Sequence, residues 1–133
     1  DMLYRFGEQI GLAFQLQDDF LDVYGDTKVF GKAIGGDIVS NKKTYMLINA
    51  FLRADAAQRA TLTRRVAAKD FDEQEKIAEV TRIYNEIGID KLALDKIEHY
   101  FNEGLRSLEA VNIDTARKQQ LVAYVNKLMK RKS

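Results

Sequence analysis

The chain has 133 residues, of which 46% are hydrophobic and 31% charged, an ordinary composition for one globular domain. It has no cysteine, which excludes a disulfide framework and a thiolate metal site. Its net charge of +1, with basic residues interspersed among acidic ones, gives no indication of nucleic-acid binding. No apolar run approaches the roughly 20 residues that a membrane span needs, so we expect no membrane span and a cytoplasmic location.

The hydrophobic periodicity predicts an all-α fold of about six helices. Proline is absent and most glycines precede residue 37, which favours long helices. An apolar stripe predicts a first helix from Met2 to about Tyr24, followed by a loop over residues 25–36. A second helix is expected over residues 37–52, with Asp37 or Ser40 as its N-cap. Four further helices are expected around Leu62 and Val66, from Ile77 to an end at Gly88, from Leu92 to Leu108, and after Asn112–Asp114 around Leu121 to Leu128.

Three carboxylates, Asp18, Asp19 and Asp22, stand in an otherwise apolar part of the first helix. Residues four apart lie one above the other on a helix, where like charges repel, so folding gives no reason for this cluster. Asp18 and Asp22 can share one hard cation, with Asp19 turned about 100° away. Such oxygen ligands suit Mg²⁺, which also bridges to substrate phosphates. The pattern predicts a magnesium site; the alternative is a solvated acidic face.

A short glycine-rich segment follows, from Phe30 to Asp37, and carries Lys32; Lys42 comes five residues later. Glycines let the backbone approach a phosphate closely, and lysines act on it as point charges. Neither a Walker loop nor a Gly-x-Gly-x-x-Gly pattern is present. The segment therefore predicts a diphosphate site beside the metal. Gly7 and Gly11, four residues apart, are interpreted instead as sites of close helix packing.

The two segments together resemble a known family. Gly11 to Asp26 looks like the second aspartate-rich region of trans-isoprenyl diphosphate synthases, the polyprenyl synthetase family. Gly31 to Thr44 resembles the segment that follows it in the short-chain farnesyl and geranylgeranyl diphosphate synthases. The two motifs occur in the right order and at the right separation, which makes the compound pattern far more specific than a lone Asp-Asp-x-x-Asp.

The resemblance implies a Mg²⁺-dependent prenyltransferase that condenses an allylic diphosphate with isopentenyl diphosphate. It implies metal binding by Asp18, Asp19 and Asp22, substrate binding by Phe14, Gln15, Lys32, Asp37 and Lys42, and catalytic roles for Lys32, Lys42 and Gln15. Phe14 is in the first place expected to be a core aromatic residue. Lys43 is expected to be an ordinary exposed lysine.

One part of the family's pattern is absent from this chain. Members carry a first Asp-Asp-x-x-Asp well upstream of the second, and here no other Asp-Asp pair occurs. We therefore expect residues 1–133 to be the C-terminal portion of a single isoprenoid synthase domain. On this interpretation the chain is inactive alone and associates through exposed apolar faces, while the full-length form is a homodimer.

Two other functions are compatible with the fold. One is a non-catalytic prenyl-synthase-like subunit that binds and regulates an active partner; buried carboxylates are costly to keep without a catalytic use, which disfavours it. The other is a terpene cyclase of related fold, in which Lys32 and Lys42 have no explanation. His99 is expected at the surface. The basic end, Lys127 to Ser133, is interpreted as a frayed helix end, with a flap over the site as the alternative.

Overall fold

The computed structural model describes residues 1–25 and 34–130, and these residues form seven helices. The first, α1 (Met2–Tyr24), has the bounds that the apolar stripe predicts. Its N-cap is Asp1, whose carboxylate accepts a hydrogen bond of 3.0 Å from the Tyr4 amide. The predicted all-α fold is confirmed. In the part of the chain that the structure describes, no helix is long and apolar enough to cross a membrane.

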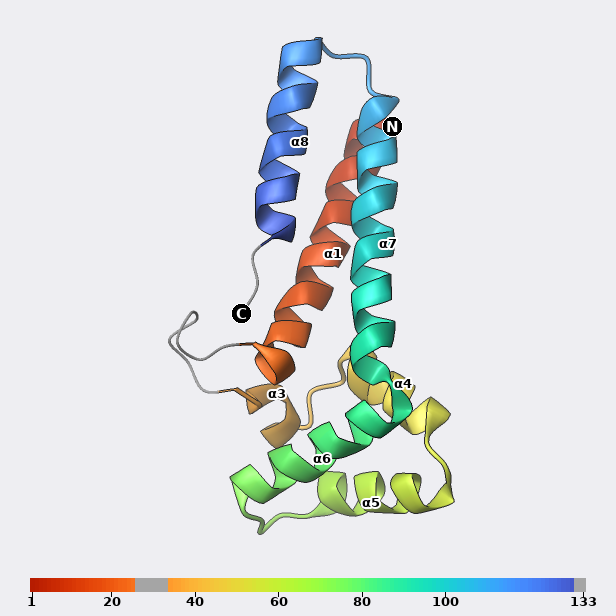
Figure 1. Cartoon of the computed structure of the whole chain (residues 1–133), viewed down its shortest axis with the longest axis vertical. Coiled ribbons are helices and arrows are strands. Elements are labelled where there is room, and N and C mark those ends of the chain that lie inside the picture. The colour runs from red at the N-terminus through yellow and green to blue at the C-terminus, as the bar shows by residue number, and fades with distance from the viewer. Residues whose placement is uncertain (26–33, 131–133) are drawn as a thin grey trace.

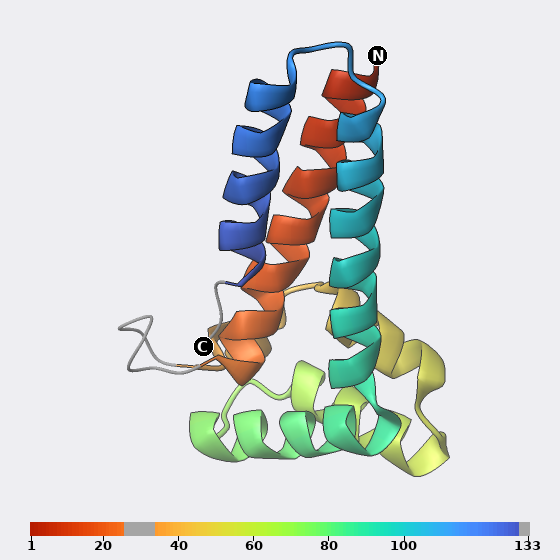
Figure 2. The ribbon, with the colours of Figure 1, turned by 45° about the horizontal axis from the view of Figure 1, so that its top comes forward.

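Three long helices run side by side as a bundle: α1, α7 (Ile89–Glu109) and α8 (Thr115–Met129) (Figures 1 and 2). Their inward side chains form one apolar cluster of Phe6, Ile10, Ala13, Ile97, Phe101, Leu108 and Val125. At Gly104, α1 and α7 approach so closely that an added Cβ would lie 2.5 Å from Ile10 Cδ1. Among the described residues, a Cβ at Gly7 or Gly11 would meet nothing within 4 Å, so the close packing expected at these two residues is wrong.

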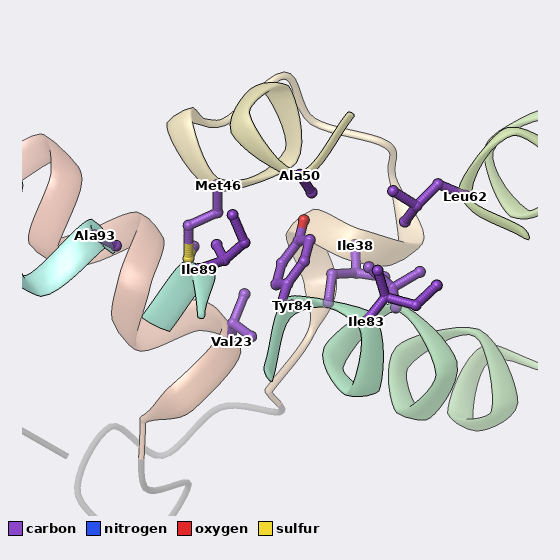
Figure 3. Close-up of a cluster of buried hydrophobic side chains, with 10 residues drawn as sticks. Val23, Ile38, Met46, Ala50, Leu62, Ile83, Tyr84, Ile89 and Ala93 are labelled. Atoms are coloured by element: carbon purple, nitrogen blue, oxygen red, sulfur yellow. The ribbon is translucent and has the colours of Figure 1, made fainter. Parts of the chain in front are cut away.

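The other four helices lie across the lower end of this bundle as an end layer: α3 (Gly36–Val39), α4 (Tyr45–Arg53), α5 (Ala56–Ala67) and α6 (Glu73–Ile87) (Figure 1). A second apolar cluster fills this layer and reaches the ends of α1 and α7, through Val23, Ile38, Met46, Ala50, Leu62, Val80, Ile83, Tyr84, Ile89 and Ala93 (Figure 3). Gly88 ends α6 as predicted, in the left-handed conformation with φ 87°.

The predicted helix over residues 37–52 is instead two helices, which is a correction to the sequence analysis. The chain leaves the helical path between α3 and α4, where Asn41 has φ 58°. An α-helix cannot continue through this left-handed backbone conformation. The N-cap of α4 is Thr44, whose hydroxyl accepts a 3.1 Å hydrogen bond from the Leu47 amide, rather than Asp37 or Ser40. We call residues 39–44 the α3–α4 turn.

Candidate functional site

The three carboxylates of α1 lie on its last two turns, where the bundle meets the end layer (Figure 1). They differ sharply in exposure: Asp18 is exposed, Asp19 is intermediate, and Asp22 is buried, with 9% of its surface exposed. Asp18 and Asp22 are four residues apart, yet Asp18 faces solvent and Asp22 faces the protein interior. The two carboxylates can therefore have different roles.

Asp22 holds the start of α3 against the end of α1. Its Oδ2 accepts a 2.8 Å hydrogen bond from the Asp37 amide, and its own carbonyl accepts one of 2.6 Å from the Gly35 amide. Gly35 has φ 97°, and an added Cβ there would lie 2.6 Å from Ile77 Cδ1. Both the backbone conformation and the lack of space therefore require glycine at this position. Asp22 thus fixes where α3 begins, and with it the position of Asp37.

Lys42 completes the cluster from the other side. Its Nζ donates a 2.9 Å hydrogen bond to Asp19 Oδ1 and lies 3.9 Å from Asp37 Oδ2. The hydrogen bond to Asp19, together with the charges of Asp19 and Asp37, raises the pKa of Lys42 above its usual value, so the lysine is protonated at neutral pH. The Lys42 side chain is 53% exposed, which leaves its ammonium within reach of a ligand in solvent.

The carboxylates fit a cation that is shared with a ligand better than an all-protein cage. Within residues 1–25 and 34–130, no group of three or more His, Cys, Asp or Glu side chains converges to hold a metal ion. The inward hydrogen bond of Asp22 sets it apart from the exposed Asp18. Mg²⁺ is commonly held by one or two carboxylates, with waters and substrate phosphates as the other ligands. Asp18 and Asp19, both reachable from solvent, suit that mode.

The remaining predicted site residues fall in three places. Phe14 is half-buried and contacts Phe101 edge to face, with ring centroids 5.6 Å apart, so it is a core aromatic residue as expected. Gln15 is exposed on α1. Lys32 lies outside the described residues. The structure therefore brings Asp19, Asp37 and Lys42 together and places Gln15 and Phe14 further back along α1.

Sequence reasoning missed the polar residues beneath the α3–α4 turn. Thr44 is buried and shares a side-chain hydrogen bond with Tyr84, whose pKa is raised, chiefly by burial. Lys76 on α6 is also buried and contacts the turn from below. A signal for Lys76 was present, because it lies four residues before Val80 and seven before Ile83, on the buried stripe of α6. A charged residue at such a position has to find partners in the interior.

Two further expectations concern the rest of the surface. His99 is exposed, with its ring 5.5 Å from that of Tyr100, in agreement with a surface histidine. At the basic end, Lys127 and Lys130 are exposed, at the end of α8. Residues 131–133, which complete that basic run, lie outside the described residues.

Comparison of the sequence with known families gives one consistent result. The sequence model of the polyprenyl synthetase family matches residues 1–86. The farnesyl pyrophosphate synthase of Nezara viridula is 40% identical over 113 residues, which cover 85% of this chain and 25% of that protein. The farnesyl pyrophosphate synthase of Rattus norvegicus is 37% identical over 100 residues, covering 75% of this chain and 27% of that protein. The chain spans about a quarter of the length of these curated relatives.

Solved structures agree with the sequence comparison. A crystal structure of a geranylgeranyl pyrophosphate synthase superposes with a TM-score of 0.87 at 38% identity, covering 99% of this chain and 41% of that one. A geranylgeranyl pyrophosphate synthase from Corynebacterium glutamicum, complexed with isoprenyl diphosphate and magnesium, gives a TM-score of 0.85 at 33% identity, covering 99% of this chain and 37% of that one. The helical arrangement is therefore one that these synthases share.

Proposed function

The chain belongs to the polyprenyl synthetase family, and from this premise we propose that its acidic cluster and Lys42 bind the diphosphate of an allylic substrate together with Mg²⁺. The reaction proposed for the whole protein is transfer of the allylic group to isopentenyl diphosphate. The observation that carries the proposal is the meeting of Asp19, Asp37 and Lys42 at the end of α1, with Lys42 Nζ 2.9 Å from Asp19 Oδ1.

We assign the metal contact to Asp18 and Asp19, with Asp22 contributing through the backbone that it orders. Bound Mg²⁺ would supply positive charge to the diphosphate oxygens as the allylic carbon–oxygen bond breaks. Asp18 is exposed and Asp19 faces Lys42, so both carboxylates border the space in which a diphosphate would bind. The buried Asp22 is already engaged by the Asp37 amide, and its role is to hold that edge of the site.

Lys42 is assigned to the departing diphosphate. In the structure its ammonium is paired with Asp19, and the two side chains are 53% and 13% exposed. A pair of this exposure is worth at most about 1 kcal/mol, so exchanging Asp19 for a phosphate oxygen costs little. A fixed ammonium beside the leaving group stabilises the negative charge that develops there. Lys32 is proposed to act in the same way, Asp37 to orient Lys42, and Phe14 and Gln15 to line the path of the allylic chain.

Titration calorimetry with inorganic diphosphate, with and without Mg²⁺, tests the proposal. We expect the wild-type chain to bind diphosphate only when Mg²⁺ is present, and Asp18→Asn to weaken this binding about 10-fold or more, because a metal ligand loses its charge. The matched control is Asp95→Asn, which removes a carboxylate from an exposed position on α7. Binding that does not depend on Mg²⁺, or that Asp18→Asn and Asp95→Asn affect equally, contradicts the assignment, as does the absence of binding by the wild type.

A further inference from the structure

Lys76 is an interior lysine whose surroundings demand an explanation. It lies on α6 with only 1% of its surface exposed, among the apolar residues of the end layer. Burying an ammonium is costly unless hydrogen bonds replace its water shell. Burial, and then the charge of Arg65, lowers the pKa of Lys76. If this position only needed to be filled, an apolar side chain of similar length would fill it without the cost of burying a charge. The ammonium group is therefore expected to have a structural role.

The ammonium of Lys76 is satisfied almost entirely by the α3–α4 turn. Its Nζ donates to the Asn41 side-chain oxygen at 2.6 Å and to the Val39 carbonyl at 3.1 Å. The third direction is covered by Phe71, whose ring centroid lies 4.4 Å away. Two acceptors from one short segment, 35 and 37 positions earlier in the chain, mean that Lys76 holds this segment in one conformation.

The conformation held in this way is an unusual one. Asn41 occupies the left-handed region with φ 58°, which few residues other than glycine adopt and which asparagine tolerates better than most. Its side chain is fixed at both ends, because its Nδ2 also donates a 3.1 Å hydrogen bond to the Val66 carbonyl at the end of α5. The turn is closed by a 2.9 Å bond from the Lys42 amide to the Asp37 carbonyl. The direction in which the Lys42 side chain extends from the turn therefore depends on Asn41 and Lys76.

We propose that Lys76 is a positioning residue: its buried ammonium locks the α3–α4 turn so that the Lys42 ammonium lies against Asp19 and close to Asp37. Lys76 itself does not contact the ligand, since its donors are used by the turn. The segment from α3 to the turn is thus held at both ends: Lys76 binds the turn, and the Asp22 carboxylate binds the start of α3. The consequence for ligand binding rests on the proposed function of Lys42; the locking of the turn does not.

Amide hydrogen exchange of Lys76→Met in the 133-residue chain tests the locking. Methionine keeps the length and apolar stem but leaves the Asn41 and Val39 oxygens unsatisfied. We expect the amides of Asn41, Lys42 and Thr44 to exchange about 10-fold faster, with the amides of α7 unchanged. Lys91→Met, at an exposed position of α7, is the matched control and should change neither set. Unchanged exchange in the turn, or an equal acceleration in α7, overturns the proposal.

A second variant keeps the test decisive if Lys76→Met does not fold. Asn41→Gly retains a residue that accepts the left-handed backbone but removes the oxygen that Lys76 binds. We expect the same selective acceleration of the turn amides, about 10-fold, because one of the two acceptors is gone. Protection of the turn equal to that of the wild type contradicts the lock.

The link to ligand binding is tested by a double-mutant cycle with Mg²⁺–diphosphate as the probe. We expect Lys76→Met to weaken binding about 10-fold when Lys42 is present and to change it less than about 2-fold in a Lys42→Met background. Equal losses in both backgrounds, or no loss in either, overturn the positioning role. If the wild-type chain binds no Mg²⁺–diphosphate, the proposed function fails, and hydrogen exchange alone still decides whether Lys76 locks the turn.

Discussion

The bundle and the end layer are built from different kinds of contact. In the bundle, α1 and α7 pack along most of their length through apolar side chains, with Gly104 allowing their close approach. The end layer also has an apolar core, but its short segments are joined by buried polar groups, Asp22 from α1 and Lys76 from α6. The proposed site lies where the two meet. The bundle supplies the carboxylates, and the layer supplies Lys42 and the backbone amide of Asp37.

This difference has a physical basis. Long helices can bury an apolar stripe against one another through many contacts that have no preferred direction. A short turn has few apolar contacts, and its direction must be set by hydrogen bonds that are satisfied only in one geometry. A diphosphate site needs that second property, because its charges must be in place before the ligand arrives.

The largest expected effect is on the bundle core. Phe101 is fully buried and contacts Phe14 edge to face, so Phe101→Ala should lower the free energy of unfolding by about 3–5 kcal/mol. Leu94→Ala, on the same helix but 49% exposed, should cost less than about 1 kcal/mol. Urea unfolding of both variants measures the difference. Similar losses in the free energy of unfolding for the two variants would contradict the placement of Phe101 in the core and Leu94 at the surface of α7.

The next effect is expected at the polar link between the two regions. Asp22→Ala removes the acceptor of the Asp37 amide and should lower the free energy of unfolding by about 2 kcal/mol. It should also speed exchange of the Asp37 amide selectively, since α1 itself keeps its backbone hydrogen bonds. Asp95→Ala is the exposed control. An equal loss of stability in Asp95→Ala would contradict the role of Asp22 as the polar contact that joins α1 to the end layer.

A pair of glycine substitutions compares the two regions directly. Gly35→Ala should destabilise by about 1–3 kcal/mol, because φ is 97° and the new methyl group meets Ile77. Gly11→Ala lies inside α1, where no atom of the part of the chain that the structure describes comes within 4 Å of the added Cβ. It should stabilise by about 0.5–1 kcal/mol. Thermal unfolding gives both values. The same sign for the two substitutions would contradict the assigned backbone conformations.

The smallest effect concerns pH. A hydrogen bond of 2.6 Å from Arg65 lowers the pKa of Glu79 below its usual 4.5 and joins α5 to α6. Glu79 thus has a lower pKa in the folded chain than in the unfolded chain. Between these two pKa values the unfolded chain binds more protons, so the stabilisation by the Arg65–Glu79 pair is lost as the pH falls through the folded-state pKa. When the pH is lowered from about 7 to about 3, the free energy of unfolding of Glu79→Gln should fall by about 0.5 kcal/mol less than that of the wild type, as measured by urea unfolding. Equal losses would mean that the pair contributes nothing.

Much of the bundle was predictable from the sequence, because its helices follow a local period. The apolar stripe gave the bounds of α1, and Gly88 and Asp114 marked a helix end and a helix start as expected. The break between α3 and α4 was not predictable in this way. It depends on Lys76 and Val66, residues distant in sequence from Asn41, and no local pattern at residues 39–44 shows their contact.

The sequence names candidate site residues, but it does not show which of them contact one another. Helical spacing placed Asp18 and Asp22 on one line, yet only the tertiary structure shows that Asp22 is turned toward the Asp37 amide. The spacing of Gly7 and Gly11 indicated close packing, whereas the residue that permits it is Gly104 on α7. In each case the deciding contact comes from another helix.

The most direct test of the account is to map the binding of Mg²⁺–diphosphate onto the chain by NMR. We predict that the largest amide shift changes occur at Asp18, Asp19, Asp37 and Lys42, while residues near Gly104 and in the α7–α8 connection stay unperturbed. Shift changes centred away from the end of α1 would contradict the claim that diphosphate binds there. The same changes with diphosphate in the absence of Mg²⁺ would contradict the proposed role of the metal.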